Sequence, residues 1–165
     1  MADQSLQDIN QAHGAGRWFP GDPQALRTMV EKYIQNAQTP TITGRIVAAI
    51  APHAGYIYSG PVAGHVFRAL RDQARAGWAP ATVIILGFSH SRSFQGAAVM
   101  DGDAIATPLG VTALDRAAAQ ILAEAGGKKR IFFDRRPHQG EHSVENLIPF
   151  IQAALPDAKL VPIII

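Results

Sequence analysis

Three continuous, mainly apolar runs along the chain have the length of a β-strand. They are Arg45–Ile50, Val83–Leu86 and Leu160–Ile165. Because apolar residues in these runs do not alternate with polar ones, we expect both faces of each strand to be buried, as in a parallel sheet covered by helices on both sides. Ile131–Phe133 is a fourth, shorter strand candidate.

Between these runs, apolar residues recur at the three- and four-residue spacing of helices. Residues up to Gly16 lack this periodicity and are expected to form a loose arm or a packed loop. Strands that alternate with helices predict a layered α/β/α fold with a largely parallel central sheet, in one domain spanning residues 1–165. The first predicted helix has Asp22 as its N-cap and Pro23 at its first position, and the second starts at Gly60-Pro61. The third is capped by Thr112 and ends at Gly126-Gly127, and the fourth spans Leu147–Leu155.

The composition is that of an ordinary globular chain, with 47% apolar and 17% charged residues among 165. The net charge of +2 is too small to indicate nucleic-acid binding without a clustered basic face, so no nucleic-acid partner is predicted. The short basic clusters Lys128–Arg130 and Arg135-Arg136 are typical of solvated loops. The absence of cysteine excludes disulfides and thiolate chemistry within these residues.

Neither end of the chain carries a membrane signal, but the carboxyl end is unusual. The first ten residues are polar, unlike a signal peptide, and no apolar run approaches the ~20 residues of a membrane span. We therefore expect a cytoplasmic protein without a membrane partner. The end at Val161–Ile165 is apolar, whereas a complete domain usually ends in a polar tail. This predicts truncation at the C-terminus, and an apolar edge that favours self-association into a homo-oligomer.

Two histidines follow two of the predicted strands at the point where each strand ends. His53 lies three residues after Ile50, and His90 lies four residues after Leu86. Ligands of open parallel sheets bind outside the carboxyl ends of the strands, so both imidazoles are expected at one edge. Two neutral imidazoles with one further ligand form a typical transition-metal site. The alternative is that the two histidines lie at strand ends by chance and have no function.

A third histidine, His142, lies between Glu141 and Ser143. Flanking carboxylates hold an imidazole in one tautomer and raise its pKa, which suits a general acid or base. The alternative is a helix entry in which Ser143 and Glu145 cap exposed amides, and the local pattern alone favours that interpretation.

Other motifs exclude two common classes of site. Gly55 and Gly60 permit a tight loop, but no GxGxxG or P-loop pattern supports nucleotide binding. Ser59 and Ser89 lie in no GxSxG motif, which disfavours a serine hydrolase.

Several segments, taken together and in order, resemble the Memo-like family, also called AmmeMemoRadiSam system protein B. The resemblance runs from about residue 13 to the end and covers roughly the first three-fifths of the family domain. The ordered set is specific, above all PHAGYxYSG together with EHSxE. The segments are AGRWFP (15–20), APHAGYIYSG (51–60), LGFSH (86–90), TPLG (107–110), EHSVEN with the following PF (141–150) and VPI (161–163).

The family in turn resembles class III extradiol dioxygenases, which bind non-haem iron(II) and cleave catechol rings. The resemblance therefore implies a dioxygenase-like fold and a metal site in which non-haem Fe(II) is the first candidate and copper or zinc the next. It implies His53 and His90 as metal ligands and His142 as a catalytic residue at the pocket. The ligand-binding residues that it implies are Gly55, Tyr56, Tyr58, Ser59, Ser89 and Glu141.

The chain departs from the family pattern in two places. The third metal ligand, usually a cysteine in the C-terminal part of the family domain, is missing from this chain. Phe88 also stands where the family's GPSH form has proline. Two hypotheses about function therefore stay open. One is a metal-dependent redox or dioxygenase-like enzyme, and the other is a non-catalytic module that binds a small-molecule or peptide ligand in a dioxygenase-like pocket.

Overall fold

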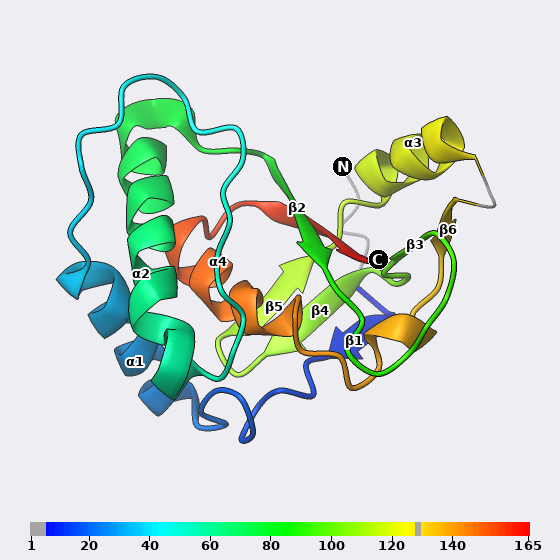
Figure 1. Cartoon of the computed structure of the whole chain (residues 1–165), viewed down its shortest axis with the longest axis horizontal. Helices are drawn as coiled ribbons and strands as arrows, with labels where there is room; N and C mark the ends of the chain where they lie inside the picture. Colours follow the sequence, from blue (N-terminus) through cyan, green and yellow to red (C-terminus); the bar gives the residue numbers. More distant parts are fainter. Residues whose placement is uncertain (1–5, 128–129) are drawn as a thin grey trace.

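Two mixed sheets organise the α/β fold (Figure 1). The computed structural model describes residues 6–127 and 130–165, so Lys128 and Lys129 of the predicted basic cluster lie outside the described residues. In the larger sheet, the outer pairs β2–β7 and β3–β6 are parallel, whereas the central pair β3–β7 is antiparallel. The sheet is therefore mixed rather than largely parallel. Its strands, in spatial order, are β2 (Thr82–Gly87), β7 (Lys159–Ile164), β3 (Ala97–Val99) and β6 (Ile131–Phe133).

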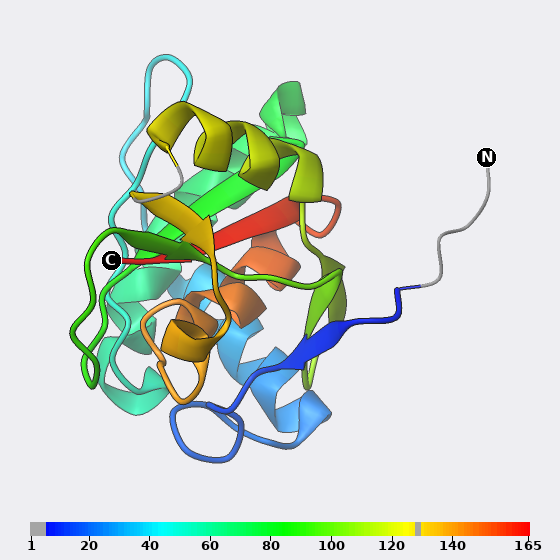
Figure 2. The same cartoon turned by 90° about the vertical axis from the view of Figure 1, so that its right-hand side faces the viewer.

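The smaller sheet was not predicted from the sequence. It consists of β1 (Ile9–Gln11), β4 (Ala104–Thr107) and β5 (Gly110–Ala113), with β1 parallel to β4 and β5 antiparallel to it (Figure 2). The expectation of a loose arm or a packed loop up to Gly16 is wrong for residues 9–11, because these residues pair with β4 as an edge strand.

The helices begin where local capping chemistry places them. Asp22 caps α1 as predicted, since its Oδ1 accepts from the Ala25 N–H at 2.7 Å. Asp115 rather than Thr112 caps α3, because Thr112 is paired with Ile105 in β5. α2 begins one turn before the predicted Gly60-Pro61 start. The helices are α1 (Pro23–Asn36), α2 (Tyr56–Gln73, extended by the π-helical turn Ala74–Trp78), α3 (Arg116–Gly126) and α4 (Ile148–Ala154), with 3-10 turns at Arg136–His138 and Glu145–Leu147.

The larger sheet buries apolar side chains on both faces. Leu160 and Ile164 of β7 belong to the main core, together with buried residues of α1, α2 and α4. Val161 and Ile163 point to the opposite face and pack with Ala119 of α3. This alternation along one strand explains why β7 reads as a continuous apolar run.

The predicted strand at Arg45–Ile50 is wrong. The segment has no regular secondary structure, and Val47 and Ile50 are 91% and 95% exposed. It runs past β2 as an extended loop (Figure 1), and a cavity of about 740 Å³ separates the two instead of a ladder of hydrogen bonds. For the same reason β2 is not buried on both faces, and Ile84 and Leu86 are at least half exposed.

None of the helices in the described ranges, 6–127 and 130–165, combines the length and apolar composition that crossing a bilayer requires. The basic pair at Arg135 and Arg136 lies at the surface in ion pairs with Asp8 and Asp134. These pairs neutralise the local positive charge, as expected of solvated loop residues.

Candidate metal centre

Three loops bring together the three histidines that the sequence singled out. His53 precedes α2, His90 follows β2, and His142 precedes the 3-10 turn at Glu145–Leu147. The ring centroids of His53 and His90 are 5.3 Å apart, those of His53 and His142 are 5.9 Å apart, and those of His90 and His142 are 4.6 Å apart. The three imidazoles thus surround one point at the edge of the larger sheet.

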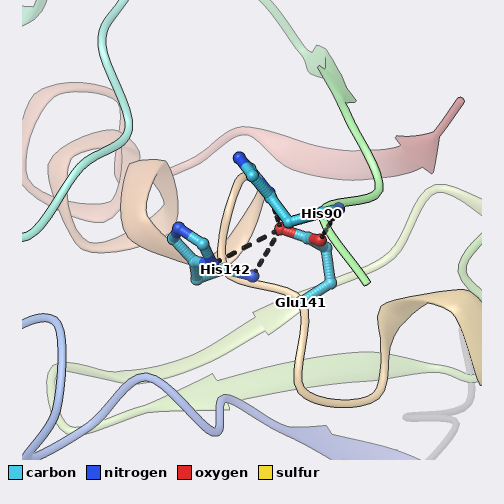
Figure 3. Close-up of side chains that lie close together, drawn as sticks. All are labelled: His90, Glu141 and His142. Carbon is cyan, nitrogen blue, oxygen red and sulfur yellow. Dashed lines mark hydrogen bonds and ion pairs between the residues drawn. The ribbon is translucent and has the colours of Figure 1, made fainter. Parts of the chain in front are cut away.

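Glu141 ties the loop after β2 to the loop before α4 (Figure 3). Its Oε2 accepts from the His90 N–H at 2.7 Å, and its Oε1 lies 2.9 Å from His90 Nδ1. The same Oε1 accepts from the N–H groups of His142 and Ser143 at 2.7 and 2.8 Å. The carboxylate is 2% exposed, so four protein N–H groups satisfy an almost fully buried charge.

These hydrogen bonds keep Glu141 ionised. Burial alone raises its pKa, but the backbone N–H groups of His90 and Ser143 and the His90 ring outweigh burial and lower the pKa to about 2. Because the ionised carboxylate only accepts, His90 donates from Nδ1 and leaves the Nε2 lone pair free. Ligand atoms of His90, Glu141 and His142 all lie within 4.8 Å of one another. We assign Glu141 the orienting role rather than a ligand role, since its lone pairs are already engaged.

His53 is held by the same segment through its backbone. The Asn146 side-chain amide donates to the His53 carbonyl at 2.7 Å. The Asn146 carbonyl in turn accepts from the Tyr56 hydroxyl at 2.8 Å. Residues 141–146, which we call the hub segment, therefore contact both loops that carry the other two histidines.

An indole ring covers one face of His142. Trp18 stacks on it with ring centroids 4.1 Å apart and an interplanar angle of 11°. The Trp18 carbonyl accepts from the Tyr56 N–H at 2.8 Å, which fixes the loop against the start of α2. Glu145 anchors the loop further upstream, since its Oε2 accepts from the Gly14 N–H at 2.8 Å.

Burial and neighbouring imidazoles favour neutral rings at this site. Partial burial, reinforced by the charge of His90, lowers the pKa of His53. Burial also lowers the pKa of His142, although Glu141 opposes the shift. The neutral imidazole is the form that binds a metal ion. The prediction that neighbouring carboxylates raise the pKa of His142 is therefore wrong, because burial outweighs them.

Glu145 makes the folded state sensitive to pH near neutrality. Burial raises its pKa to about 7 against the His13 and Gly14 N–H groups, so the folded state binds this proton more tightly than the unfolded chain. Its stabilising effect is complete below the ordinary value of 4.5 and declines as the pH rises to about 7, by about 3 kcal/mol. Glu145→Gln should remove this decline, measured by urea unfolding of the metal-free protein at pH 5 and pH 8. Glu124→Gln, which changes an exposed carboxylate, should retain it. An unchanged pH dependence in Glu145→Gln would contradict this account.

The structure places the remaining predicted ligand-binding residues around the start of α2 and the loop after β2. Gly55 is the N-cap of α2, and Tyr56 is 2% exposed in the core, where it supports Asn146. Tyr58 is 77% exposed, and the Ser59 hydroxyl donates to the Ala54 carbonyl. The Ser89 hydroxyl accepts from the Arg92 N–H. A ligand-binding role for these residues stays a prediction.

The sequence did not identify Trp18 or Asn146 as site residues, and it treated Glu145 only as a helix cap. All three lie in segments that carried the family resemblance, AGRWFP and EHSVEN. Their roles depend on contacts with distant parts of the chain, so spacing alone contained no signal for them.

Comparison with known proteins gives a consistent family result. A protein-family model described as Memo-like protein matches residues 10–165. A MEMO1 family protein of Methanothermobacter thermautotrophicus is 35% identical over 155 residues, which are 90% of this chain and 54% of that protein. Relatives in Methanopyrus kandleri and Pyrobaculum aerophilum are 36% and 37% identical over 84% and 91% of this chain, and over 49% and 53% of their own lengths. The chain thus spans about half the length of the curated relatives it matches.

Proposed function

The chain belongs to the Memo-like protein family, and we propose that in it His53 and His90 bind a transition-metal ion, with His142 beside them as the catalytic residue. Non-haem Fe(II) is the first candidate and copper or zinc the next. The observation that carries the proposal is the convergence of three imidazoles whose ring centroids lie 4.6–5.9 Å apart. Imidazole nitrogens suit iron, copper and zinc.

The surroundings of the three rings fit a metal site. His90 donates one ring nitrogen to a buried carboxylate, which is how proteins orient a metal-binding histidine and raise its basicity. A lowered pKa keeps His53 neutral at pH 7, so a cation does not have to displace a proton from it.

We further propose a redox or dioxygenase-like role, within a layered fold like that of class III extradiol dioxygenases. A bound iron or copper ion would supply electrophilic activation and one-electron chemistry. His142 is then suited to accept a proton at a ring nitrogen, because its pKa is lowered. Trp18, stacked on the same ring, excludes water from one face.

A non-catalytic role is the second candidate, and the Trp18 ring stacked on His142 supports it. An indole packed beside three imidazoles provides aromatic and polar recognition of a small-molecule or peptide ligand without turnover. Oxygen consumption with catechol-type substrates discriminates between the two roles. Consumption that depends on added Fe(II) supports the enzyme, and a metal-loaded protein without turnover supports the binding module.

Substitution of the histidines tests the metal site directly. His53→Ala and His90→Ala should each weaken Fe(II), Cu(II) or Zn(II) binding by about 100-fold or more, because each removes one of few ligands. Calorimetric titration together with elemental analysis after dialysis measures the effect. His65→Ala is the matched control, since His65 lies exposed on α2 with its Nδ1 near the Gln38 carbonyl. Metal content that is unchanged in both site variants would refute the proposal.

A further inference from the structure

β2 has one paired edge and one open edge. On the paired side, Ala81 O accepts from Lys159 N–H at 2.9 Å and Gly87 O accepts from Ile165 N–H at 3.0 Å. In a parallel ladder, the backbone N–H and C=O groups of successive residues point alternately to the two neighbouring strands. The backbone groups of the odd-numbered residues of β2 therefore point to β7, and those of the even-numbered residues point away from it. Among residues 6–127 and 130–165, no strand pairs with β2 on that second side. The N–H and C=O groups of Ile84 and Leu86 therefore point to an unpaired edge.

An apolar cavity of about 740 Å³ lies along this open edge. Residues 46–51 form the opposite wall, and the lining also includes Phe67 of α2 and Ile151 of α4. Apart from His53 and Thr82, the residues that line the cavity are apolar. We call this space, between residues 46–51 and β2, the edge slot.

The chemistry of the edge slot fits a polypeptide strand better than a small molecule. An apolar ligand would leave the peptide groups of Ile84 and Leu86 unpaired, and unpaired strand edges favour association with another strand. An added strand satisfies those groups and buries its own side chains against the apolar walls. It would also cover Val47 and Ile50, whose exposure of more than 90% is unusual for such side chains.

The length of the relatives identifies the source of such a strand. Each relative compared above has about as much chain outside the matched region as within it. We propose that the edge slot binds an extended apolar strand from that other part of a MEMO1 family protein, and that this strand completes the larger sheet beyond β2. Because His53 also lines the slot, the docked strand would run beside the three imidazoles. This proposal does not depend on which metal the histidines bind.

Amide hydrogen exchange resolved by residue tests the proposal in two stages. In the chain alone, the Ile84 and Leu86 amides should exchange at least 10-fold faster than the Val83 and Ile85 amides, which face β7. The second stage attaches the unmatched part of the Methanothermobacter thermautotrophicus relative through a flexible Gly–Ser linker, which raises its effective concentration to the millimolar range. The Ile84 and Leu86 amides should then slow by at least 10-fold in a protein that light scattering shows to be monomeric.

Two variants make the test specific to the edge slot. Ile84→Pro removes only an N–H that faces the slot, so it should abolish the added protection while β2 keeps its ladder to β7. Ile84→Glu keeps the N–H but places a charge on an apolar wall, and it should also abolish the protection. Ile84→Val is the control and should keep it.

Three results would overturn the proposal. The first is absence of added protection in the fusion protein. The second is slow exchange of Ile84 and Leu86 in the monomeric chain alone, which would mean that residues 45–50 close the slot themselves. The third is slow exchange in a dimer of the chain alone, which would assign the slot to a second copy.

Discussion

Replacing Glu141 with glutamine should destabilise the fold by about 3–5 kcal/mol, because it breaks a buried charge network without removing its partners. One amide oxygen cannot replace two carboxylate oxygens that accept from four N–H groups on His90, His142 and Ser143. The glutamine NH₂ group, itself a hydrogen-bond donor, would also lie against some of these N–H donors. Chemical denaturation at pH 7 measures the loss.

The same substitution should also reduce the dependence of the free energy of unfolding on pH at acidic pH. The folded-state pKa of Glu141, about 2, lies below its ordinary value of 4.5. The stabilisation is therefore complete above pH 4.5 and is lost as the pH falls towards 2. This range does not overlap with that of Glu145, whose effect is lost between pH 4.5 and about 7. Unfolding free energies measured from pH 2 to 8 separate the two carboxylates.

Metal affinity provides a second measurement on Glu141→Gln. Because Glu141 sets the orientation and tautomer of His90, its loss should weaken metal binding by about 10- to 100-fold. Glu124→Gln is the isosteric surface control and should change neither stability nor affinity by a measurable amount. A Glu141→Gln protein as stable as the parent at pH 7 would show that the four N–H groups find other partners.

Gly87→Ala should cost about 3 kcal/mol through overpacking and should weaken the metal centre as well. A Cβ atom at this last residue of β2 would lie 2.5 Å from Val144 Cγ2 and 2.6 Å from Ser143 Oγ. Ser143 cannot move freely, since its hydroxyl accepts from the Phe88 N–H at 3.1 Å and donates to the Phe88 carbonyl at 2.9 Å. The methyl group must therefore push the loop that carries His90 away from the hub segment.

Thermal unfolding and metal titration of Gly87→Ala check this expectation. Gly21→Ala is the matched control, because a Cβ there meets no heavy atom closer than 3.4 Å and the backbone conformation suits an L-residue. If Gly87→Ala unfolds and binds metal like Gly21→Ala, the close packing between β2 and the hub segment is not required for the site.

Local signals predicted the elements whose formation depends on local chemistry. The Asp22 cap and the apolar spacing after it indicated α1, and the run before Ile165 indicated β7. Arg45–Ile50 has an equally apolar composition but forms no strand, because strand formation requires a partner and the open edge of β2 is not in contact with it. The short strands β3, β4 and β5 were not predicted, because their small and polar residues form no continuous run of large apolar side chains like that of the equally short β6.

The candidate site was predictable only where its residues follow a strand that the sequence itself indicates. His53 and His90 were identified because ligands of open sheets lie beyond strand ends, and His90 does follow β2. His53 reaches the site without a preceding strand, since Asn146 holds its carbonyl. The stacking of Trp18 on His142 joins the first and last thirds of the chain, and no local pattern could reveal it.

The hub segment also sets the order in which the site is assembled. The contacts of its residues reach back 51 residues to His90, 55 to Phe88, 93 to His53 and 131 to Gly14. Loops of this length close late, because their entropic cost precedes the contacts that reward it. During synthesis, the loops that carry His53 and His90 are not held in place until the ribosome has released residues 141–146. Metal binding would therefore follow the docking of the hub segment on the loops that carry His53 and His90, and would not nucleate earlier folding steps.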